Sequence, residues 1–76
     1  MIPSVILVDV SISIRVNLQH ALTVAGFNVI ACENAALTRK ALQNGSFDLM
    51  LVDLNLPDGN GFELAQEIRA TASRSN

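Results

Sequence analysis

The run SVILV at positions 4–8 constrains the fold of this chain more than any other feature. It ends in four consecutive β-branched or leucine residues and is followed by Asp9. An unbroken apolar run is typical of a strand that is covered on both faces, as in parallel sheets. Two further runs, FNVIAC at 27–32 and FDLMLV at 47–52, predict a second and a third strand, and Asp53 follows the third.

Helical patterns separate these strands. Ser11 or Ser13 can cap the first helix, Asn34 can cap the second, and Gly26 is a natural stop after the first. The apolar face expected to join the core in the first helix comprises Ile14, Leu18, Ala21, Leu22 and Ala25. We predict strands at about 4–9, 27–32 and 47–53, helices at about 13–25, 35–44 and 61–70, and a small polar tail at 71–76 that frays.

The resulting order, βαβαβα, predicts an α/β fold with a parallel sheet between layers of helices, that is, a three-layer α/β/α arrangement. Parallel crossovers are right-handed in nearly all proteins. A second strand on one side of the first and a third strand on the other give the order 2-1-3, with helices on opposite faces. At 76 residues the chain forms one domain, residues 1–76.

Composition narrows the classes of function. Half of the residues are apolar and only 16% are charged, which excludes disorder and leaves more apolar surface than one small core hides. The net charge is −2 and the basic residues are scattered, so we expect no nucleic-acid binding by this segment. The first apolar run is too short to span a membrane. The single cysteine, Cys32, excludes an internal disulfide and fits a cytoplasmic location.

Two acids follow strands that would be neighbours in this order. Asp9 comes after the first strand and Asp53 after the third. Ligands of open α/β sheets bind beyond the carboxyl ends of the strands, where the winding reverses. Two carboxylates there form a candidate cation site. The alternative is that both acids only end strands and face water.

Several segments together resemble the receiver domain of two-component response regulators. They are VILVD at 5–9, Arg15, GFNV at 26–29, DLMLVDLNLPDGNGFEL at 48–64 and IRA at 68–70. The most specific part is a strand ending in Asp53, followed by Pro57 and then by Gly59 or Gly61 at the start of a helix. The resemblance runs from 6 to 70 and covers the first three of the family's five βα units. It therefore implies a truncated receiver, flavodoxin-like in fold, that lacks the last two units.

The resemblance also implies a chemistry. Asp53 matches the aspartate that accepts a phosphoryl group from a phosphohistidine. The family's Mg²⁺ ligands match Asp53, Asp9 and the backbone carbonyl of Asn55. Val10 stands where the family has a second acid, and valine offers no ligand. We therefore expect weak or absent Mg²⁺ binding.

Two further family residues have no counterpart in these 76 residues. The family carries a Ser or Thr after its fourth strand and a Lys after its fifth, and both contact the phosphoryl group. The only lysine here, Lys40, falls on the second predicted helix. We expect a signalling module rather than an enzyme, weakly or not phosphorylated, that acts through protein–protein association. A histidine kinase or a phosphotransfer protein is the partner that the family suggests.

Two other functions are alternatives, but the sequence lacks a residue that each of them needs. An aspartate-dependent phosphatase needs a second acid two residues after the nucleophile, but Asn55 stands two residues after Asp53 and Ser11 two after Asp9. A nucleotide-binding half-domain needs a glycine-rich first turn, and the turn DVSIS contains no glycine. His20 and Cys32 are interpreted as structural or solvated residues.

The missing units predict self-association. Without the family's fourth strand, Phe47 to Val52 is an exposed apolar edge, which is a ready template for pairing. We expect a homo-oligomer in which two third strands meet across a two-fold axis, and in which the first helix joins the interface.

Overall fold

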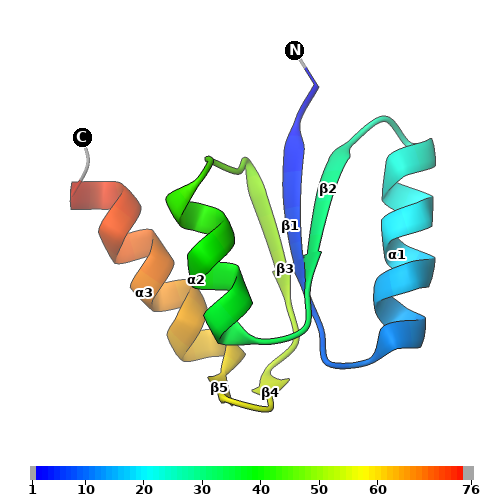
Figure 1. Cartoon of the computed structure of the whole chain (residues 1–76). Coiled ribbons are helices and arrows are strands. Elements are labelled where there is room, and N and C mark those ends of the chain that lie inside the picture. The colour runs from blue at the N-terminus through cyan, green and yellow to red at the C-terminus, as the bar shows by residue number, and fades with distance from the viewer. Residues whose placement is uncertain (1, 75–76) are drawn as a thin grey trace.

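A three-stranded parallel sheet separates one helix from two others, as Figure 1 shows. The computed structural model describes residues 2–74. The strand order is β2-β1-β3, so the predicted α/β/α fold with order 2-1-3 is confirmed. The strands are β1 (Ser4–Val8), β2 (Asn28–Cys32), β3 (Leu49–Val52), β4 (Asn55–Leu56) and β5 (Gly59–Asn60). The helices are α1 (Ile12–Val24), α2 (Ala35–Gln43) and α3 (Gly61–Arg74).

The central strand β1 is buried on both faces. Val5, Ile6, Leu7 and Val8 are each no more than 2% exposed. Ile6 and Val8 belong to a core cluster beneath α2 and α3 that also contains Leu64 of α3. Because successive side chains of a strand point to opposite faces, Val5 and Leu7 point toward α1. An unbroken apolar run is therefore what this central position requires.

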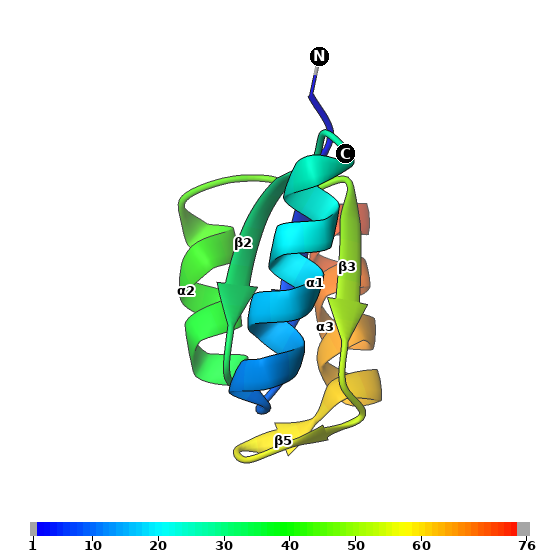
Figure 2. The same cartoon turned by 90° about the vertical axis from the view of Figure 1, so that its right-hand side faces the viewer.

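The face under α1 is covered incompletely. No side chain of α1 is buried, and α1 packs chiefly against β2. Ile14 is 44% exposed and Leu18 is 40% exposed, although the helical spacing predicted both as core residues. That prediction was wrong because α1 lies alone on its side of the sheet, as Figures 1 and 2 show, so no second helix covers its flank.

Local signals set the helix ends. The Ser11 side chain caps α1 by accepting the Ile14 N–H at 3.4 Å, and Asn34 caps α2 by accepting the Leu37 N–H at 2.8 Å. Gly26 follows α1 with φ of +100°, in the left-handed region where other residues are strained.

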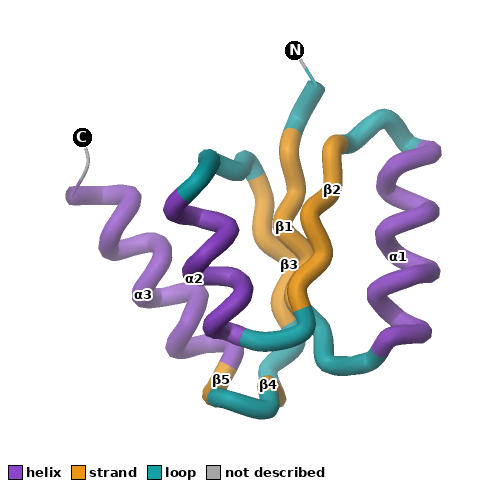
Figure 3. Tube along the Cα trace, viewed as in Figure 1, coloured by secondary structure: helices purple, strands orange, loops and turns teal. Residues whose placement is uncertain are grey.

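The elements differ in several details from those expected from the sequence. The segment predicted as an open loop before α3 contains the short antiparallel hairpin β4–β5, seen in Figure 3 at the carboxyl end of the sheet. Helix α3 continues to Arg74, although a fraying tail was expected from position 71; residues 75 and 76 lie outside the described part of the chain. The Thr71 hydroxyl donates to the Glu67 carbonyl at 3.0 Å along this extension. Each of the three parallel strands is one to three residues shorter than predicted.

No helix among residues 2–74 is long and apolar enough to cross a membrane.

The burial of β1 predicts a specific stability difference. Ile6 on β1 is 1% exposed, whereas its register partner Ile30 on β2 is 48% exposed. We expect Ile6→Ala to lower the free energy of unfolding by about 2–5 kcal/mol, because it leaves a cavity in the core. The matched variant Ile30→Ala should cost clearly less. Urea denaturation followed by circular dichroism measures both, and equal losses would contradict the central role of β1.

Candidate functional site

Asp9 and Asp53 lie side by side at the carboxyl edge of the sheet. The residues before them, Val8 and Val52, are register partners in the β1–β3 pair. The Asp53 N–H donates to the Val8 carbonyl at 2.8 Å, and the Asp9 N–H donates to the Cys32 carbonyl at 3.0 Å. Both acids are half-buried. Backbone hydrogen bonds between β1 and its two neighbouring strands therefore fix the backbone positions of Asp9 and Asp53.

Each carboxylate is oriented by one backbone N–H close in sequence. Asp9 Oδ1 accepts the Ser11 N–H at 2.8 Å, and Asp53 Oδ1 accepts the Asn55 N–H at 3.2 Å. Within residues 2–74 the second oxygen of each carboxylate receives no hydrogen bond. One oxygen of each acid is thus oriented by the protein, and the other is available to a cation or, at Asp53, to an electrophile.

Asn55 begins the hairpin that follows Asp53. It lies in β4 opposite Asn60 of β5, and it is exposed. Its backbone therefore lies two residues past Asp53 at the same edge of the sheet, where the resemblance requires a carbonyl ligand.

Val10 and Arg15 shape the other side of this edge. Val10 is 50% exposed and contributes an apolar side chain where a carboxylate would add a ligand. Arg15 Nη1 donates to the Asp9 carbonyl at 2.7 Å and to the Val10 carbonyl at 3.1 Å, which ties the turn after β1 to α1. In the sequence, Arg15 is notable only as part of the resemblance; its role in the turn comes from contacts with carbonyls five and six residues earlier.

The donors at this edge are of the chemical kind that Mg²⁺ prefers. Two carboxylates and one backbone carbonyl are hard oxygen ligands, which Mg²⁺ prefers, and Mg²⁺ commonly keeps several waters. Among the described residues no group of three or more His, Cys, Asp or Glu side chains could hold a metal. The residues present therefore fit a hydrated ion held by two acids.

The only lysine lies away from this edge. Lys40 is in the last turn of α2, and α2 starts at the carboxyl end of β2 and runs back along the sheet, as Figure 1 shows. Thr38, on the same helix, is fully buried, and its hydroxyl donates to the Asn34 carbonyl at 2.9 Å. Neither side chain is placed to contact a group on Asp53.

The resemblance required a glycine at the start of the third helix, and the sequence did not show whether this is Gly59 or Gly61. Gly61 begins α3 directly against Asp53: a Cβ there would overlap the Asp53 carbonyl oxygen and lie 2.8 Å from its carbonyl carbon. The Gly61 N–H also donates to the Leu54 carbonyl at 2.9 Å. A Cβ at Gly59 would meet nothing within 4 Å. Gly61 is therefore the residue whose lack of a side chain allows α3 to approach Asp53.

Cys32 and His20 take no part in the site chemistry that the described residues show. Cys32 is 5% exposed in the core, and burial raises the pKa of its thiol, which keeps it protonated. His20 is exposed on α1.

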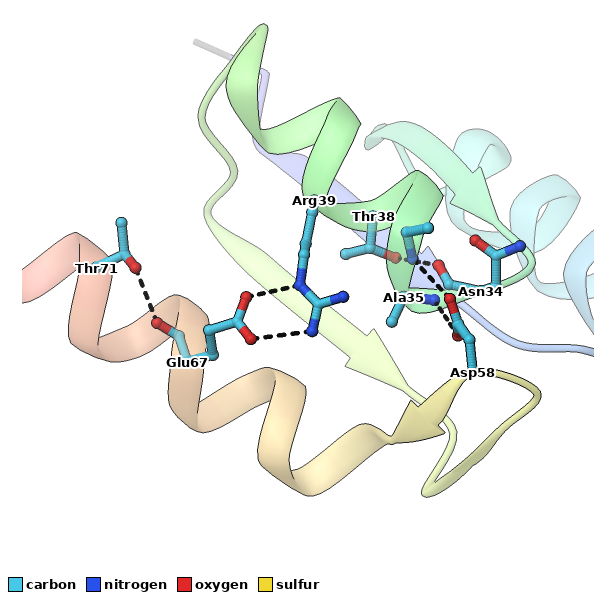
Figure 4. A network of polar contacts seen from close by, with 8 residues as sticks. Asn34, Ala35, Thr38, Arg39, Asp58, Glu67 and Thr71 are labelled. Carbon is cyan, nitrogen blue, oxygen red and sulfur yellow. Dashed lines mark hydrogen bonds and ion pairs between the residues drawn. The ribbon is translucent and has the colours of Figure 1, made fainter.

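An unexpected contact joins the loop between Asp53 and Gly61 to helix α2. Asp58, at the tip of the β4–β5 hairpin, accepts the Ala35 N–H at 2.8 Å and the Ala36 N–H at 3.0 Å with its two oxygens. These two backbone bonds lower the pKa of the Asp58 carboxyl, because they bind its charged form. Figure 4 shows this contact beside the Arg39–Glu67 ion pair. The sequence offered no signal for it, because the partners lie 23 residues apart.

The Arg39–Glu67 pair links α2 to α3 across a hollow of about 590 Å³. Two hydrogen bonds of 2.8 and 3.0 Å join the guanidinium to the carboxylate. Their contact raises the pKa of Arg39 and lowers that of Glu67. Both side chains are about half exposed, so water screens the attraction and the pair adds little to stability.

The close approach of Gly61 predicts an asymmetric effect of two alanine substitutions. Gly61→Ala should lower the free energy of unfolding by about 1–3 kcal/mol, because the new Cβ forces the Asp53 backbone and α3 apart. It should also shift the Asp53 and Leu54 amide resonances. Gly59→Ala, with open space around its Cβ and no positive φ, should do neither. Unperturbed Asp53 resonances in Gly61→Ala would contradict the packing described above.

Comparison with known proteins agrees with this geometry. The model of the response regulator receiver domain family matches residues 5–76. The swarming motility regulation protein RssB of Serratia marcescens is 40% identical over 60 residues, 79% of this chain and 27% of that protein. The TorCAD operon transcriptional regulatory protein TorR of Escherichia coli K12 is 40% identical over 55 residues, 72% of this chain and 24% of its own length.

Solved structures share the fold. The chemotaxis response regulator CheY4 of Vibrio cholerae superposes with a TM-score of 0.86 at 33% identity, over 91% of this chain and 57% of that one. TrrA of Thermotoga maritima, solved in complex with Mg²⁺–BeF, gives a TM-score of 0.86 at 30% identity, over 92% and 61% of the two chains. This chain thus spans about a quarter of the length of these two regulatory proteins and a little over half of these two solved chains. It belongs to the response regulator receiver domain family.

Proposed function

We propose that this chain is a receiver module with a weakened phosphoacceptor site at Asp53, and that it acts mainly through association with other proteins. Receiver domains serve two-component signalling, generally bind Mg²⁺ at the phosphorylation site and interact with histidine kinases or phosphotransfer proteins. The observation that carries the proposal is the pairing of Asp53 with Asp9 at one edge, beside Val10.

The chemistry assigned to Asp53 is nucleophilic. Its free carboxylate oxygen forms an O–P bond to the phosphoryl group, giving an acyl phosphate. The P–N bond of a donor phosphohistidine breaks, and its electron pair stays on the imidazole nitrogen, which is then protonated. Bound Mg²⁺ neutralises phosphoryl oxygens in this chemistry. Asp9, Asp53 and the Asn55 carbonyl are its proposed ligands.

Two observations support a weak site. Val10 supplies no oxygen, so the side-chain ligands number two. Lys40 lies at the far end of α2, and no lysine lies near Asp53 within the described residues. Fewer ligands, and no lysine at this edge among the described residues, leave the charge of a phosphoryl group poorly compensated, which lowers both the extent and the lifetime of modification.

Phosphorylation by a small donor tests this assignment. We expect acetyl phosphate with Mg²⁺ to add one phosphoryl group to a minor fraction of the chain, measured by intact mass, and Asp53→Ala to abolish it. Val10→Asp should raise the Mg²⁺ affinity about tenfold, because ligand charge sets affinity in oxygen sites.

An adduct that survives in Asp53→Ala would contradict the acceptor assignment. Full modification of the natural chain at low Mg²⁺ concentration would contradict the weakened site.

The proposed association uses the free edge of β3. Within the described chain β3 pairs only with β1 and lies at the outer edge of the sheet, as Figure 2 shows, so the backbone groups on its outer side are unpaired. The strand contains only apolar residues, and Leu49 is 48% exposed. Beside it, an open hollow of about 250 Å³ is lined by Leu7, Leu18 and Leu51.

A second copy of this chain suits that surface. Two β3 strands related by a two-fold axis run antiparallel, pair their free backbone groups and extend the sheet to six strands. The same axis brings the exposed apolar flanks of both α1 helices toward the dimer interface.

A cytoplasmic location stays a prediction, which depends on the presence of a single cysteine.

Sedimentation of the natural chain and of two matched lysine variants tests the dimer. Leu49→Lys should raise the dimer dissociation constant at least about tenfold, since charge on a sheet edge opposes edge-to-edge pairing. Ile30→Lys, equally exposed on the opposite edge strand, should leave it unchanged. A stable monomer at high concentration, or equal effects of both variants, would refute pairing through β3.

A further inference from the structure

The tip of the β4–β5 hairpin is fastened to the start of α2 by one carboxylate. Asp58 accepts both the Ala35 and the Ala36 N–H groups, and Figure 4 shows it reaching from the hairpin to the first turn of the helix. The first N–H groups of a helix have no partner within the helix, and its N-terminus favours negative charge. Asn34 takes the next free N–H, that of Leu37. Two side chains from different parts of the chain thus cap one helix end.

Only one of these two caps reaches the site. Asn34 belongs to the segment that leads into α2, so its contact is local. Asp58 lies in the loop between Asp53 and α3, so its contact holds that loop against a different element. Because backbone N–H groups bind the charged form and lower the pKa of Asp58, the carboxylate stays ionised at neutral pH and the contact is intact there.

The loop from Asp53 to Gly61 has three other attachments. The Asp53 N–H pairs with β1, Leu56 is buried in the core at 8% exposure, and the Gly61 N–H bonds the Leu54 carbonyl. The first attaches the start of the loop to the sheet, the second attaches its middle to the core, and the third joins the two ends of the loop to each other. Asp58 is the attachment at the tip, on the side of the hairpin away from β3.

We propose that Asp58 is a positioning residue for the phosphoacceptor site: by docking the hairpin on the N-terminus of α2, it fixes the backbone of Asn55 beside Asp53. The proposal rests on the assignment of Asp53 and the Asn55 carbonyl as site residues. The competing explanation is that Asp58 only stabilises α2, as any helix cap does.

Two alanine variants separate these explanations. Asp58→Ala and Asn34→Ala each remove a cap from the same helix end, but only the first releases the hairpin. We expect amide hydrogen exchange at Asn55 and Gly61 to become about tenfold faster in Asp58→Ala, and to stay at the natural rate in Asn34→Ala once global stability is taken into account. Asp58→Glu, which keeps the carboxylate, should restore part of the protection.

A titration with Mg²⁺ alone, followed by the Asp53 and Asn55 amide resonances, gives the second readout. We expect Asp58→Ala to bind Mg²⁺ about tenfold more weakly, as is typical when a residue that orients ligands is lost, and Asn34→Ala to bind it as the natural chain does. If the natural chain binds no Mg²⁺, the proposed metal site fails, and the exchange rates alone decide the role of Asp58. Equal exchange in the two alanine variants would overturn the proposal.

Discussion

Burial of β1 on both faces is the constraint on which the rest of the structure depends. A strand that water cannot reach must have its N–H and C=O groups paired on both edges, so β1 needs β2 and β3 as neighbours. Crossover connections then place helices on both faces. Since neighbouring parallel strands end at the same edge of the sheet, the residues that follow β1 and β3 lie next to each other. The adjacency of Asp9 and Asp53 is thus a consequence of the core.

The sequence determined what depends on local pattern. Apolar runs predicted the three strands, and Asn34 and Gly26 mark helix ends by their own chemistry. The order 2-1-3 needed the further condition that the second and third strands lie on opposite sides of the first. Periodicity marked Ile14 and Leu18 as core residues, because it identifies the apolar side of a helix and not what covers it. The expectation that the first helix joins an interface came from the resemblance alone. The sequence could not identify Asp58 as a cap of α2: turn residues predicted a loop there, but the partner depends on where α2 begins in space.

The two faces of the sheet therefore differ in how completely helices cover them. Beneath α2 and α3 a continuous core contains Ile6, Val8 and Leu64, and the hairpin is fastened to the same layer. The Arg39–Glu67 pair joins the two helices at the surface, but its exposure means that apolar packing holds them. The α1 side has the opposite character, with exposed Ile14 and Leu18 and an uncovered strand edge. The side covered by α2 and α3 is suited to hold a site rigid, and the side covered by α1 is suited to bind another protein.

Val10 changes the balance of charge at the site as well as the number of ligands. Three carboxylates at one edge repel one another, so such an edge depends on a cation for its stability. With Val10 in place of one acid, two remain, and each is already oriented by a backbone N–H. The Arg15 guanidinium on the carbonyls of the same turn adds positive charge nearby. The edge is thus less dependent on a bound metal, while the free strand of β3 is exposed whether or not a metal is present. The association that we propose through β3 therefore does not depend on the phosphorylation that we propose at Asp53.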